Sequence, residues 1–297
     1  MSSTGNAVAP KVQDFAGEYT LQELLVAAAA REINEGEVVF AGVGIPCLGA
    51  LVAKLTRAPN MLMVVESGCF GPKPYRLMLG IGDNSCIENA TCVSPLWRAF
   101  GDQQRGYFDL GMLGGAQVDK YGNLNSTAIF AGGDYYKPRT RLPGSGGAND
   151  IAVSAQRTLI MMNQQKRRFL ERVDYITSPG YLDGPGAREK YGYPGGGPAV
   201  IISNMAIFRF EPQTKEAYLD SVHPGVTAED VKKEVSWELK VSPTLKTTPA
   251  PTKNEVEIIR ILDAEKIYTG AGLKGLTADK YFQMLDESYD KLKAMFR

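Results

Sequence analysis

The feature that most constrains the fold is a strand–turn–helix–strand unit near the start of the chain. Residues 37–41 form a short, mainly apolar run, a glycine turn GVGIP follows at 42–46, and residues 47–57 have helical apolar spacing. Five apolar residues at 61–65 then predict a strand that is buried on both faces. The two strands of such a unit run parallel, and the crossover is right-handed in nearly all cases. The sequence therefore predicts an α/β fold with an open, mostly parallel sheet and flanking helices.

Glu66 follows the second predicted strand directly, and a turn through Ser67 and Gly68 comes next. Parallel strands end at the same edge of a sheet, and open α/β sheets bind ligands at that edge. Glu66 and the turn that holds Gly42 and Gly44 are therefore expected to share one crevice. By position alone, a solvated glutamate at a strand end is the commoner explanation, so the argument for function depends on the neighbouring segments.

The two glycines of this turn could also be half of a dinucleotide fingerprint. The third glycine of that pattern would fall at position 47, where Cys47 stands. The end of the next strand offers no acidic residue for a ribose except Glu66 itself. The pattern is therefore only a weak indication of NAD binding.

A second glycine-rich segment, GSGGAND, lies at 144–150, after a basic and aromatic run at 135–141. Three glycines within four residues allow backbone N–H groups to converge on an anion or an oxyanion. A flexible surface loop has the same composition. Composition alone leaves both interpretations open.

Composition and charge exclude several classes of function. Lys and Arg number 33, as do Asp and Glu, so the net charge is zero. A nucleic-acid or anionic-membrane partner would normally require a basic excess. No apolar run reaches the length of a membrane span, which is about 18 residues or more. The first ten residues also lack the pattern of a signal peptide.

The cysteines and the histidine exclude other kinds of site. Four scattered cysteines do not form a disulfide framework, and without an export signal we expect reduced thiols in the cytoplasm. Cys69 lies close to Glu66, but no histidine is nearby in the sequence to activate it. The only histidine, His223, precedes Pro224 in a turn-like stretch. A single histidine excludes a multi-histidine metal site, and its place in loop sequence argues against a Ser-His-Asp arrangement. We predict no metal.

The rest of the chain divides into segments by pattern. A capping box from Thr20 to Glu23 opens a helix for which Gly36 is a plausible stop, and Thr277 opens an amphipathic helix. The apolar stripe of that last helix could be a subunit contact or could fold back on its own domain. Further strands are predicted at 107–113, 159–162, 173–177, 200–203 and 206–210. The predicted organisation is a leader at 1–18, a main domain at 19–241, a Pro/Thr/Lys-rich linker at 242–253 and a helical extension at 254–297.

Several of these motifs, taken in order, resemble one family. GVGIP at 42–46, VVESG at 64–68, GGAQVDKYGN at 114–123 and GSGGAN at 144–149 resemble the β subunit of class I CoA-transferases. The runs GDYYKPRTR, KRRF and TSPGYLDGPG, which begin at residues 133, 166 and 177, are similar to the glutaconate branch in particular. The resemblance covers roughly residues 20 to 240, and several motifs in register are far more specific than any one of them.

The resemblance implies a chemistry for Glu66, which matches the family's catalytic glutamate in a Glu-Ser/Asn-Gly motif. It implies ping-pong transfer through an acyl-glutamyl anhydride and a glutamyl-CoA thioester, with CoA as substrate and no permanently bound cofactor. Backbone N–H groups of the 146–148 turn would stabilise the tetrahedral oxyanions. The residues expected to contact the CoA thioester are Gly42, Gly44, Gly146, Gly147, Ala148 and Asn149.

The resemblance also implies a partner and leaves alternatives. The family's active unit needs an α half of similar fold, and this chain contains no second glycine-rich βαβ copy. Relatives on this scaffold hydrolyse CoA esters, cleave carbon–carbon bonds in CoA-linked ring acids or decarboxylate, and some of the latter two kinds lack the glutamate. Its presence here favours transfer, while a non-catalytic subunit would leave Glu66 and the glycine segment unexplained together. Arg139 and Arg141 suggest dicarboxylic substrates, although they could equally be solvated loop charges.

Overall fold

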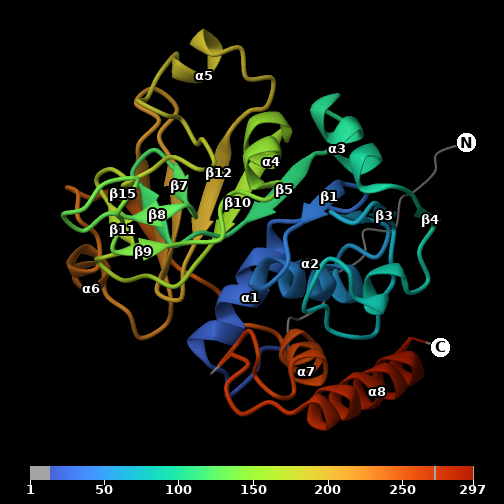
Figure 1. Ribbon diagram of the computed structural model, residues 1–297. Helices are drawn as coiled ribbons and strands as arrows, with labels where there is room; N and C mark the ends of the chain where they lie inside the picture. The colour runs from blue at the N-terminus through green and yellow to red at the C-terminus, as the bar shows by residue number, and fades with distance from the viewer. Residues whose placement is uncertain (1–13, 271, 297) are drawn as a thin grey trace, which may run out of the picture.

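The computed structural model describes residues 14–270 and 272–296, so residues 1–13 of the predicted leader lie outside the described residues. A ten-stranded sheet forms the centre of the structure (Figure 1). In order across the sheet its strands are β15 (Lys240–Thr247), β14 (Ala217–Val222), β13 (Ala206–Phe210), β12 (Pro198–Ile202), β10 (Arg157–Met161), β5 (Leu110–Leu113), β1 (Val38–Ala41), β2 (Leu62–Val65), β3 (Cys69–Phe70) and β4 (Cys92–Val93).

The central five strands, from β12 to β2, all run parallel, whereas β13, β3 and β4 are joined by antiparallel pairing. The parallel strands are almost entirely buried, as expected for apolar runs that are covered on both faces. The predicted open, mostly parallel α/β sheet is confirmed. The hairpin predicted at 200–210 is also confirmed, as β12 and β13.

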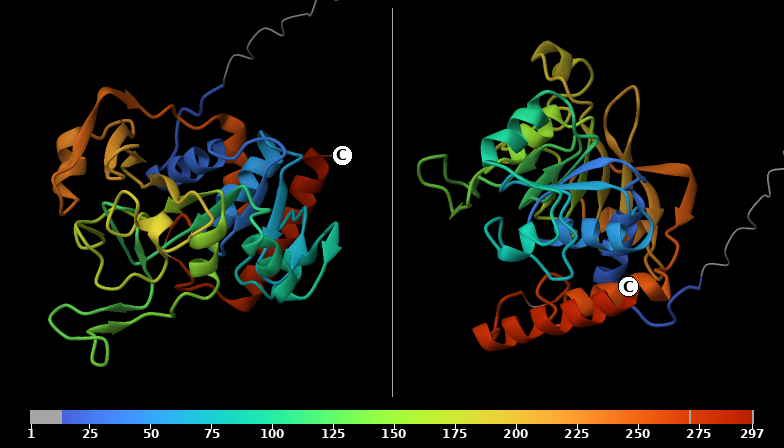
Figure 2. Two further views of the ribbon diagram at one scale, coloured as in Figure 1. Left: turned by 90° about the horizontal axis from the view of Figure 1, so that it is seen from above. Right: turned by 90° about the vertical axis from the view of Figure 1, so that its right-hand side faces the viewer.

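Helices cover both faces of the sheet, as Figures 1 and 2 show. On one face, α1 (Leu21–Arg31), α2 (Ile45–Thr56), α7 (Lys253–Leu262) and α8 (Ala278–Met295) contribute to one hydrophobic core. On the other face, α3 (Leu96–Gln104) and α4 (Ala148–Ser154) contribute to a second core. The sheet is therefore the middle of three layers.

Local signals set where the helices begin more accurately than where they end. Thr20 caps α1 through the predicted capping box with Glu23, and Thr277 caps α8. Helix α1 ends at Arg31, however, rather than near Gly36. The guanidinium of Arg57, just after α2, donates to carbonyls at the end of α1, among them that of Ile33 at 2.7 Å. A side chain from the next helix thus satisfies the terminal carbonyls earlier than the sequence indicates.

Smaller elements flank the sheet at both of its ends. They are a three-stranded sheet of β6 (Gln117–Asp119), β7 (Leu124–Asn125) and β11 (Phe169–Leu170), a hairpin of β8 (Ala128–Ile129) and β9 (Thr140–Arg141), a 3-10 helix η1 (Asn84–Ile87), and the short helices α5 (Ala187–Lys190) and α6 (Ala228–Lys233). A turn joins β6 to β7, with Gly122 at a φ of 71° that favours glycine.

Two sequence predictions are wrong in this region. The first half of the predicted linker at 242–253 is not a loop, because β15 runs through Thr247 as an edge strand parallel to β14. Pro243 is compatible with an edge strand, which leaves one row of backbone groups unpaired, so the Pro-rich composition was misleading. The segment 173–177 is not a strand; its backbone is held instead by side chains, such as Gln117 Oε1, which accepts the Asp174 N–H at 3.2 Å.

The C-terminal extension folds back on its own domain. Helix α7 buries Val256, Ile258 and Ile259, and Arg31 pairs with Glu255 at 2.7 Å. Leu292 of α8 is fully buried in the core, while Phe282 on the same helix remains 61% exposed. The predicted stripe therefore covers the α1–α2 layer and is not free as a whole for a subunit contact. Of the helices described, none is both long enough and apolar enough to cross a membrane.

Candidate active site

Glu66 lies at the first position of a tight hairpin turn between β2 and β3. Val65 pairs with Cys69 across the hairpin, so Glu66, Ser67 and Gly68 form a three-residue turn at the carboxyl edge of the sheet. Glu66 is half-buried and, within residues 14–270 and 272–296, its carboxylate has no hydrogen-bond or ion-pair partner. Glu66 thus follows strand β2 at the carboxyl edge, as predicted, with a carboxylate that is unpaired in the described residues.

Gly68 is required for this turn. Its φ is 94°, and a Cβ atom at this position would lie 2.1 Å from the carbonyl oxygen of Ser94. The Ser94 N–H donates to the Gly68 carbonyl at 2.9 Å, which ties the turn to the segment leading into α3. Backbone conformation and close packing together explain why a glycine follows Glu66 by two residues.

The segment at 144–149 lies against Glu66. A Cβ atom at Gly147 would lie 3.2 Å from Glu66 Oε1 and 2.2 Å from Phe100 Cζ, and one at Gly146 would lie 3.9 Å from the same carboxylate oxygen. Gly147 is buried and is the N-cap of α4. A side chain at Gly147 would therefore clash with the Phe100 ring and would make a tight contact with the carboxylate.

The backbone N–H groups of this turn are not equally available. The Ala148 N–H donates to the Ser145 carbonyl at 2.9 Å, so it already has a partner. Within the residues that the structure describes, the N–H groups of Gly146 and Gly147 donate to no backbone carbonyl. Asn149, the second residue of α4, is exposed. Of the three backbone donors predicted at 146–148, Gly146 and Gly147 therefore keep an N–H group without a backbone partner in the described residues.

The other predicted glycine turn lies at the same sheet edge. Continuing the β1–β2 register by two residues places Gly42 opposite Glu66. The Gly42 N–H donates to the Met112 carbonyl of β5 at 3.3 Å, and a Cβ there would lie 2.9 Å from that oxygen. Gly44 is the N-cap of α2 with a φ of 104°. Both positions have structural reasons to be glycine, and their contact with CoA remains a prediction.

Arg188 holds α4 in place from its far end. This side chain is only 4% exposed and donates to the carbonyls of Ala152 and Val153 in α4 at 3.1 and 3.0 Å. It also donates to the Gly195 carbonyl at 2.9 Å. The helix that begins at Gly147 is therefore anchored by a cation at its carboxyl end, which is the favourable end for a positive charge.

The rejected nucleophile and base are structural residues, as the sequence suggested. Cys69 is fully buried, and burial raises the pKa of its thiol to about 11. His223 is also fully buried; its ring nitrogens lie 3.0 Å from Thr248 Oγ1 and 2.8 Å from the Ser203 carbonyl. Burial lowers the pKa of His223 to about 4, so it stays neutral near pH 7. Among the described residues, no group of three or more His, Cys, Asp or Glu side chains could hold a metal ion.

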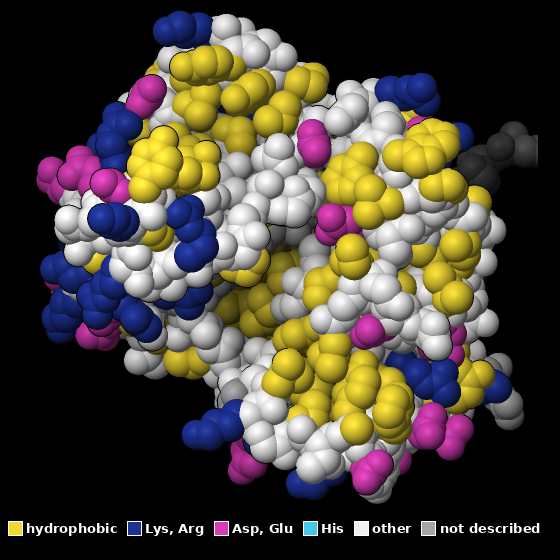
Figure 3. All heavy atoms as spheres, viewed as in Figure 1, with side chains coloured by type: hydrophobic (Ala, Val, Ile, Leu, Met, Phe, Trp, Pro, Cys, Tyr) yellow, Lys and Arg dark blue, Asp and Glu magenta, His cyan; other side chains and the backbone are white. Residues whose placement is uncertain are grey.

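The two arginines that suggested dicarboxylic substrates lie apart from Glu66. Both are exposed on or beside β9, and the guanidinium of Arg141 lies 4.8 Å from the centre of the Tyr135 ring. Figure 2 shows that the β8–β9 hairpin projects from the body of the molecule. In Figure 3, Lys and Arg side chains gather over this lobe, beside a hollow with hydrophobic side chains at its floor. Among the described residues, neither arginine forms an ion pair with Glu66.

Sequence reasoning missed two neighbours of the glutamate. Phe100 of α3 packs between Gly147 and Phe40, with the two ring centres 5.7 Å apart. The Ser67 hydroxyl is buried and has no partner in the part of the chain that the structure describes. An apolar residue on an amphipathic helix gives no signal of a site in the sequence, whereas Ser67 could have been considered because it adjoins Glu66.

With this geometry established, comparison with known proteins assigns the chain to a class. The sequence matches the coenzyme A transferase family over residues 23–234. That match covers well over half of the chain, and the chain belongs to this family.

Two relatives near 40% identity are the B subunits of transferases. The chain is 42% identical over 247 residues to the B subunit of 3-oxoadipate CoA-transferase from Pseudomonas knackmussii, covering 83% of this chain and 94% of that protein. It is 40% identical over 248 residues to the B subunit of glutaconate CoA-transferase from Acidaminococcus fermentans, covering 82% and 91%. The crystal structure of that glutaconate CoA-transferase superposes with a TM-score of 0.80 and 37% identity, covering 87% of this chain and 100% of the other.

More distant relatives are named for other chemistries. A cholesterol ring-cleaving hydrolase IpdB subunit from Mycobacterium tuberculosis is 27% identical over 249 residues, covering 82% of this chain and 94% of that protein. The structure of the decarboxylase AibA/AibB has a TM-score of 0.71 at 26% identity, covering 84% of this chain and 96% of the other. The resemblance inferred from the sequence motifs is confirmed, with the transferases at the higher identity.

Proposed function

We propose that this chain is the catalytic B subunit of an enzyme that exchanges coenzyme A between an acyl-CoA and a free carboxylic acid, with Glu66 as nucleophile. A Glu66 oxygen attacks the thioester carbonyl, and the carbon–sulfur bond breaks to give an acyl-glutamyl anhydride and CoA thiolate. The thiolate then attacks the Glu66 carbonyl, which releases the first carboxylate and leaves a glutamyl-CoA thioester. An incoming carboxylate reverses these steps and departs as the new acyl-CoA.

The observation that supports this proposal most directly is the free carboxylate of Glu66 beside the Gly147 backbone. An oxygen of Glu66 lies 3.2 Å from the position that a Cβ of Gly147 would occupy, and no cation in the described residues pairs with it. A carboxylate that is already paired would have to lose its partner before attack. Glu66 needs no such step.

The same turn supplies donors for the developing negative charge. Both addition steps pass through tetrahedral oxyanions, and the unpaired N–H groups of Gly146 and Gly147 are the nearest backbone candidates to stabilise them. Such donors act mainly in the transition state, and removing one typically costs about 10²–10³ in rate.

We further propose that the carboxylic substrates are small dicarboxylic acids. The two relatives near 40% identity are named for 3-oxoadipate and glutaconate, and both of these are dicarboxylates. Arg139 and Arg141 provide exposed cations on or beside β9 for a second carboxylate.

The proposed partner is an α subunit of similar fold. Both transferase relatives are named as B subunits. Glu66 lies half-buried at an open sheet edge, and a second chain would exclude water from the acyl-enzyme. We expect the chain alone to lack transferase activity and to regain it on mixing with its partner. Activity that elutes from gel filtration with a homo-oligomer of this chain would contradict this.

Hydrolysis or carbon–carbon cleavage on the same scaffold is the alternative. The relatives with these names are 26–27% identical, well below the transferases. Glu66 would also be expected to form a covalent intermediate only in transfer or thioester hydrolysis. Transfer is distinguished from hydrolysis by whether an added carboxylate captures the CoA or free CoA accumulates instead.

Trapping the intermediate tests the proposal. The assembled enzyme is incubated with acyl-CoA and then with hydroxylamine or borohydride, and the peptide containing residue 66 is examined by mass spectrometry. We expect a hydroxamate or a reduced side chain at Glu66, and none in Glu66→Gln. The exposed Glu229 of α6 is the matched control, because Glu229→Gln should trap like the wild type. Active enzyme with an unmodified Glu66 peptide would refute the mechanism.

A further inference from the structure

A groove lined by lysines lies where α8 packs back on the body of the molecule. Two adjoining cavities, of about 430 and 470 Å³, share Lys73, Tyr75 and Phe296 in their walls. Lys54 lines the first cavity and Lys293 lines the second. We call these two cavities together the lysine groove. Their size is within the range of small-molecule sites, which is about 300–1,000 Å³.

The groove is separate from the candidate active site. Helix α2 begins at the carboxyl edge of the sheet, just after Gly44, and Lys54 is in its last turn. With a rise of about 1.5 Å per residue, Lys54 lies on the order of 14 Å along the helix axis from that edge. Neither cavity is lined by a residue of the 144–149 segment or by Glu66.

The charges that line the groove are all positive. Neither cavity has an Asp or Glu in its wall, although the chain as a whole has no net charge. In the described part of the chain, none of the three lysines forms an ion pair. The nearest acidic residues have other partners: Glu88 pairs with Arg76 at 2.5 Å, and Glu35 accepts hydrogen bonds from Asn60.

Lys54 is the least expected of the three cations, because it is only 8% exposed. Its ammonium donates to the carbonyls of Met61 at 2.7 Å and Pro59 at 3.3 Å, which leaves one of its three N–H groups over. Burial lowers the pKa of Lys54, and the charge of Lys73 lowers it further against an opposing effect of Glu35. A bound anion would stabilise the charged form of Lys54 against both its burial and the repulsion from Lys73.

An apolar and aromatic wall faces these cations. The rings of Tyr75 and Phe296 are parallel, at 1° between planes with centres 6.3 Å apart. Leu51 and Leu55 of α2 complete the wall of the first cavity. At the other end, Lys293 donates to the Tyr289 hydroxyl at 2.9 Å. The groove therefore combines a cationic rim with a surface suited to an apolar or flat group.

The two sides of the groove come from different parts of the chain. Lys54 and Lys73 belong to the segment that matches the family, whereas Lys293 and Phe296 come from α8 and its end, beyond the matched residues 23–234. We propose that the lysine groove binds an organic anion, namely a carboxylate or phosphate on an apolar or aromatic body, as a ligand additional to the substrates at Glu66. The ammonium groups meet the anionic head, and Tyr75 and Phe296 hold the body.

Titration calorimetry on the full-length chain, alone and with its partner subunit, tests this proposal. The probes are AMP, octanoate and inorganic phosphate. AMP carries a phosphate on an aromatic group, octanoate carries a carboxylate on an apolar chain, and inorganic phosphate is an anion with no organic group. We expect AMP or octanoate to bind with a Kd below about 1 mM and phosphate to bind at least about tenfold more weakly. Binding of AMP alone assigns a phosphate head, and binding of octanoate alone assigns a carboxylate head.

Variants locate the binding. Lys73→Ala, at an exposed position, should weaken binding at least about tenfold. Folded Lys54→Met protein should show the same loss. Lys291→Ala is the matched control, since Lys291 is an exposed α8 lysine paired with Glu287 outside the groove, and it should bind like the wild type. If AMP binds at an acyl-CoA site instead, its affinity will be unchanged in Lys73→Ala. That result would refute the assignment of AMP binding to the lysine groove. Equal affinity for inorganic phosphate, or no binding of either organic anion, would also overturn it.

Discussion

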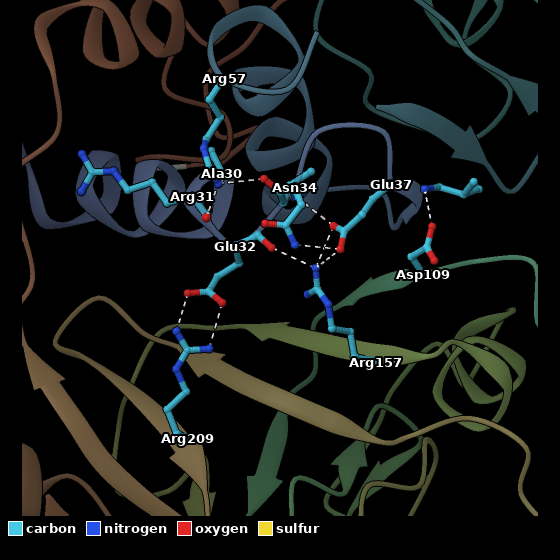
Figure 4. Close-up of polar contacts among 11 residues, drawn as sticks. Ala30, Arg31, Glu32, Asn34, Glu37, Arg57, Asp109, Arg157 and Arg209 are labelled. Carbon is cyan, nitrogen blue, oxygen red and sulfur yellow. Dashed lines mark hydrogen bonds and ion pairs between the residues drawn. The ribbon is translucent and has the colours of Figure 1, made fainter. Parts of the chain in front are cut away.

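The amino edge of the central sheet holds paired carboxylates, whereas Glu66 at the carboxyl edge is unpaired. At the amino edge every carboxylate in Figure 4 has a partner: Arg157 contacts Glu37 at 2.7 Å, Arg209 contacts Glu32 at 2.5 and 2.8 Å, and Asp109 accepts the Val38 N–H at 2.8 Å. These pairs join α1, β1, β5, β10 and β13. At the carboxyl edge, Glu66 has no partner in the described residues.

The difference teaches which acidic residues stabilise the fold and which are available for chemistry. Burial alone would raise the pKa of Glu37, but hydrogen bonds from Asn34 and from Arg157 outweigh it, so the pKa is lowered. Such a carboxylate is held in its charged form and is fully engaged. Glu66, in contrast, is held by its backbone turn alone, which positions the carboxylate without occupying its oxygens.

The contrast between the two edges is tested most directly by replacing Glu66 and Glu37, one at a time, with glutamine. Glu66→Gln should reduce transferase turnover by about 10⁴-fold or more, since the nucleophile is lost, while the midpoint of denaturant unfolding stays unchanged. Steady-state kinetics and urea unfolding on the same preparation measure both effects. A variant that kept a tenth of the wild-type turnover would show that Glu66 is not the nucleophile.

The next effect concerns the turn opposite Glu66. Gly147→Ala should lower kcat by about 10²-fold with little change in KM, because the added Cβ meets the carboxylate and displaces the oxyanion donors. That Cβ also meets Phe100, so the same change is made in a Phe100→Ala background, where only the contact with Glu66 remains. If the double variant recovers the turnover of Phe100→Ala, the loss came from ring packing and not from the site.

At the amino edge the expected effect is on stability instead. Glu37→Gln should lower the free energy of unfolding by about 1.5–3 kcal/mol, because the charged hydrogen bonds with Arg157 are lost and the arginine keeps no carboxylate partner there. Turnover of the assembled enzyme should be unchanged. Denaturant unfolding together with an activity assay checks both, and a loss of turnover without a loss of stability would contradict the division between the two edges.

The smallest effect is in the pH dependence of that stability. Since the pKa of Glu37 in the folded chain is below its ordinary value of 4.5, its contribution is fully present above pH 4.5 and is lost as the pH falls through the lowered value. The gap in unfolding free energy between wild type and Glu37→Gln should therefore shrink below pH 4.5. A gap that stayed constant down to the lowest accessible pH would mean that the ion pair is not its source.

Much of this architecture could be predicted because its signals are local. The βαβ unit, the turn after Glu66 and the caps at Thr20 and Thr277 each depend on residues within a few positions of one another. Apolar periodicity reports burial on one or two faces, and glycine reports a backbone that no other residue adopts readily. The position of Glu66 and the turn that follows it at the carboxyl edge were therefore accessible from the sequence.

Other features needed the tertiary structure, because they join residues far apart in the chain. Only the fold shows that Gly147 faces Glu66 with Phe100 behind it, and that Ala148 already has a hydrogen-bond partner. The edge strand β15 was concealed by its proline, since an edge strand forms by pairing with a neighbour and not by its own composition. The sequence by itself determined where Glu66 and its turn lie; long-range packing decided which backbone groups surround Glu66 and which charges are left unpaired.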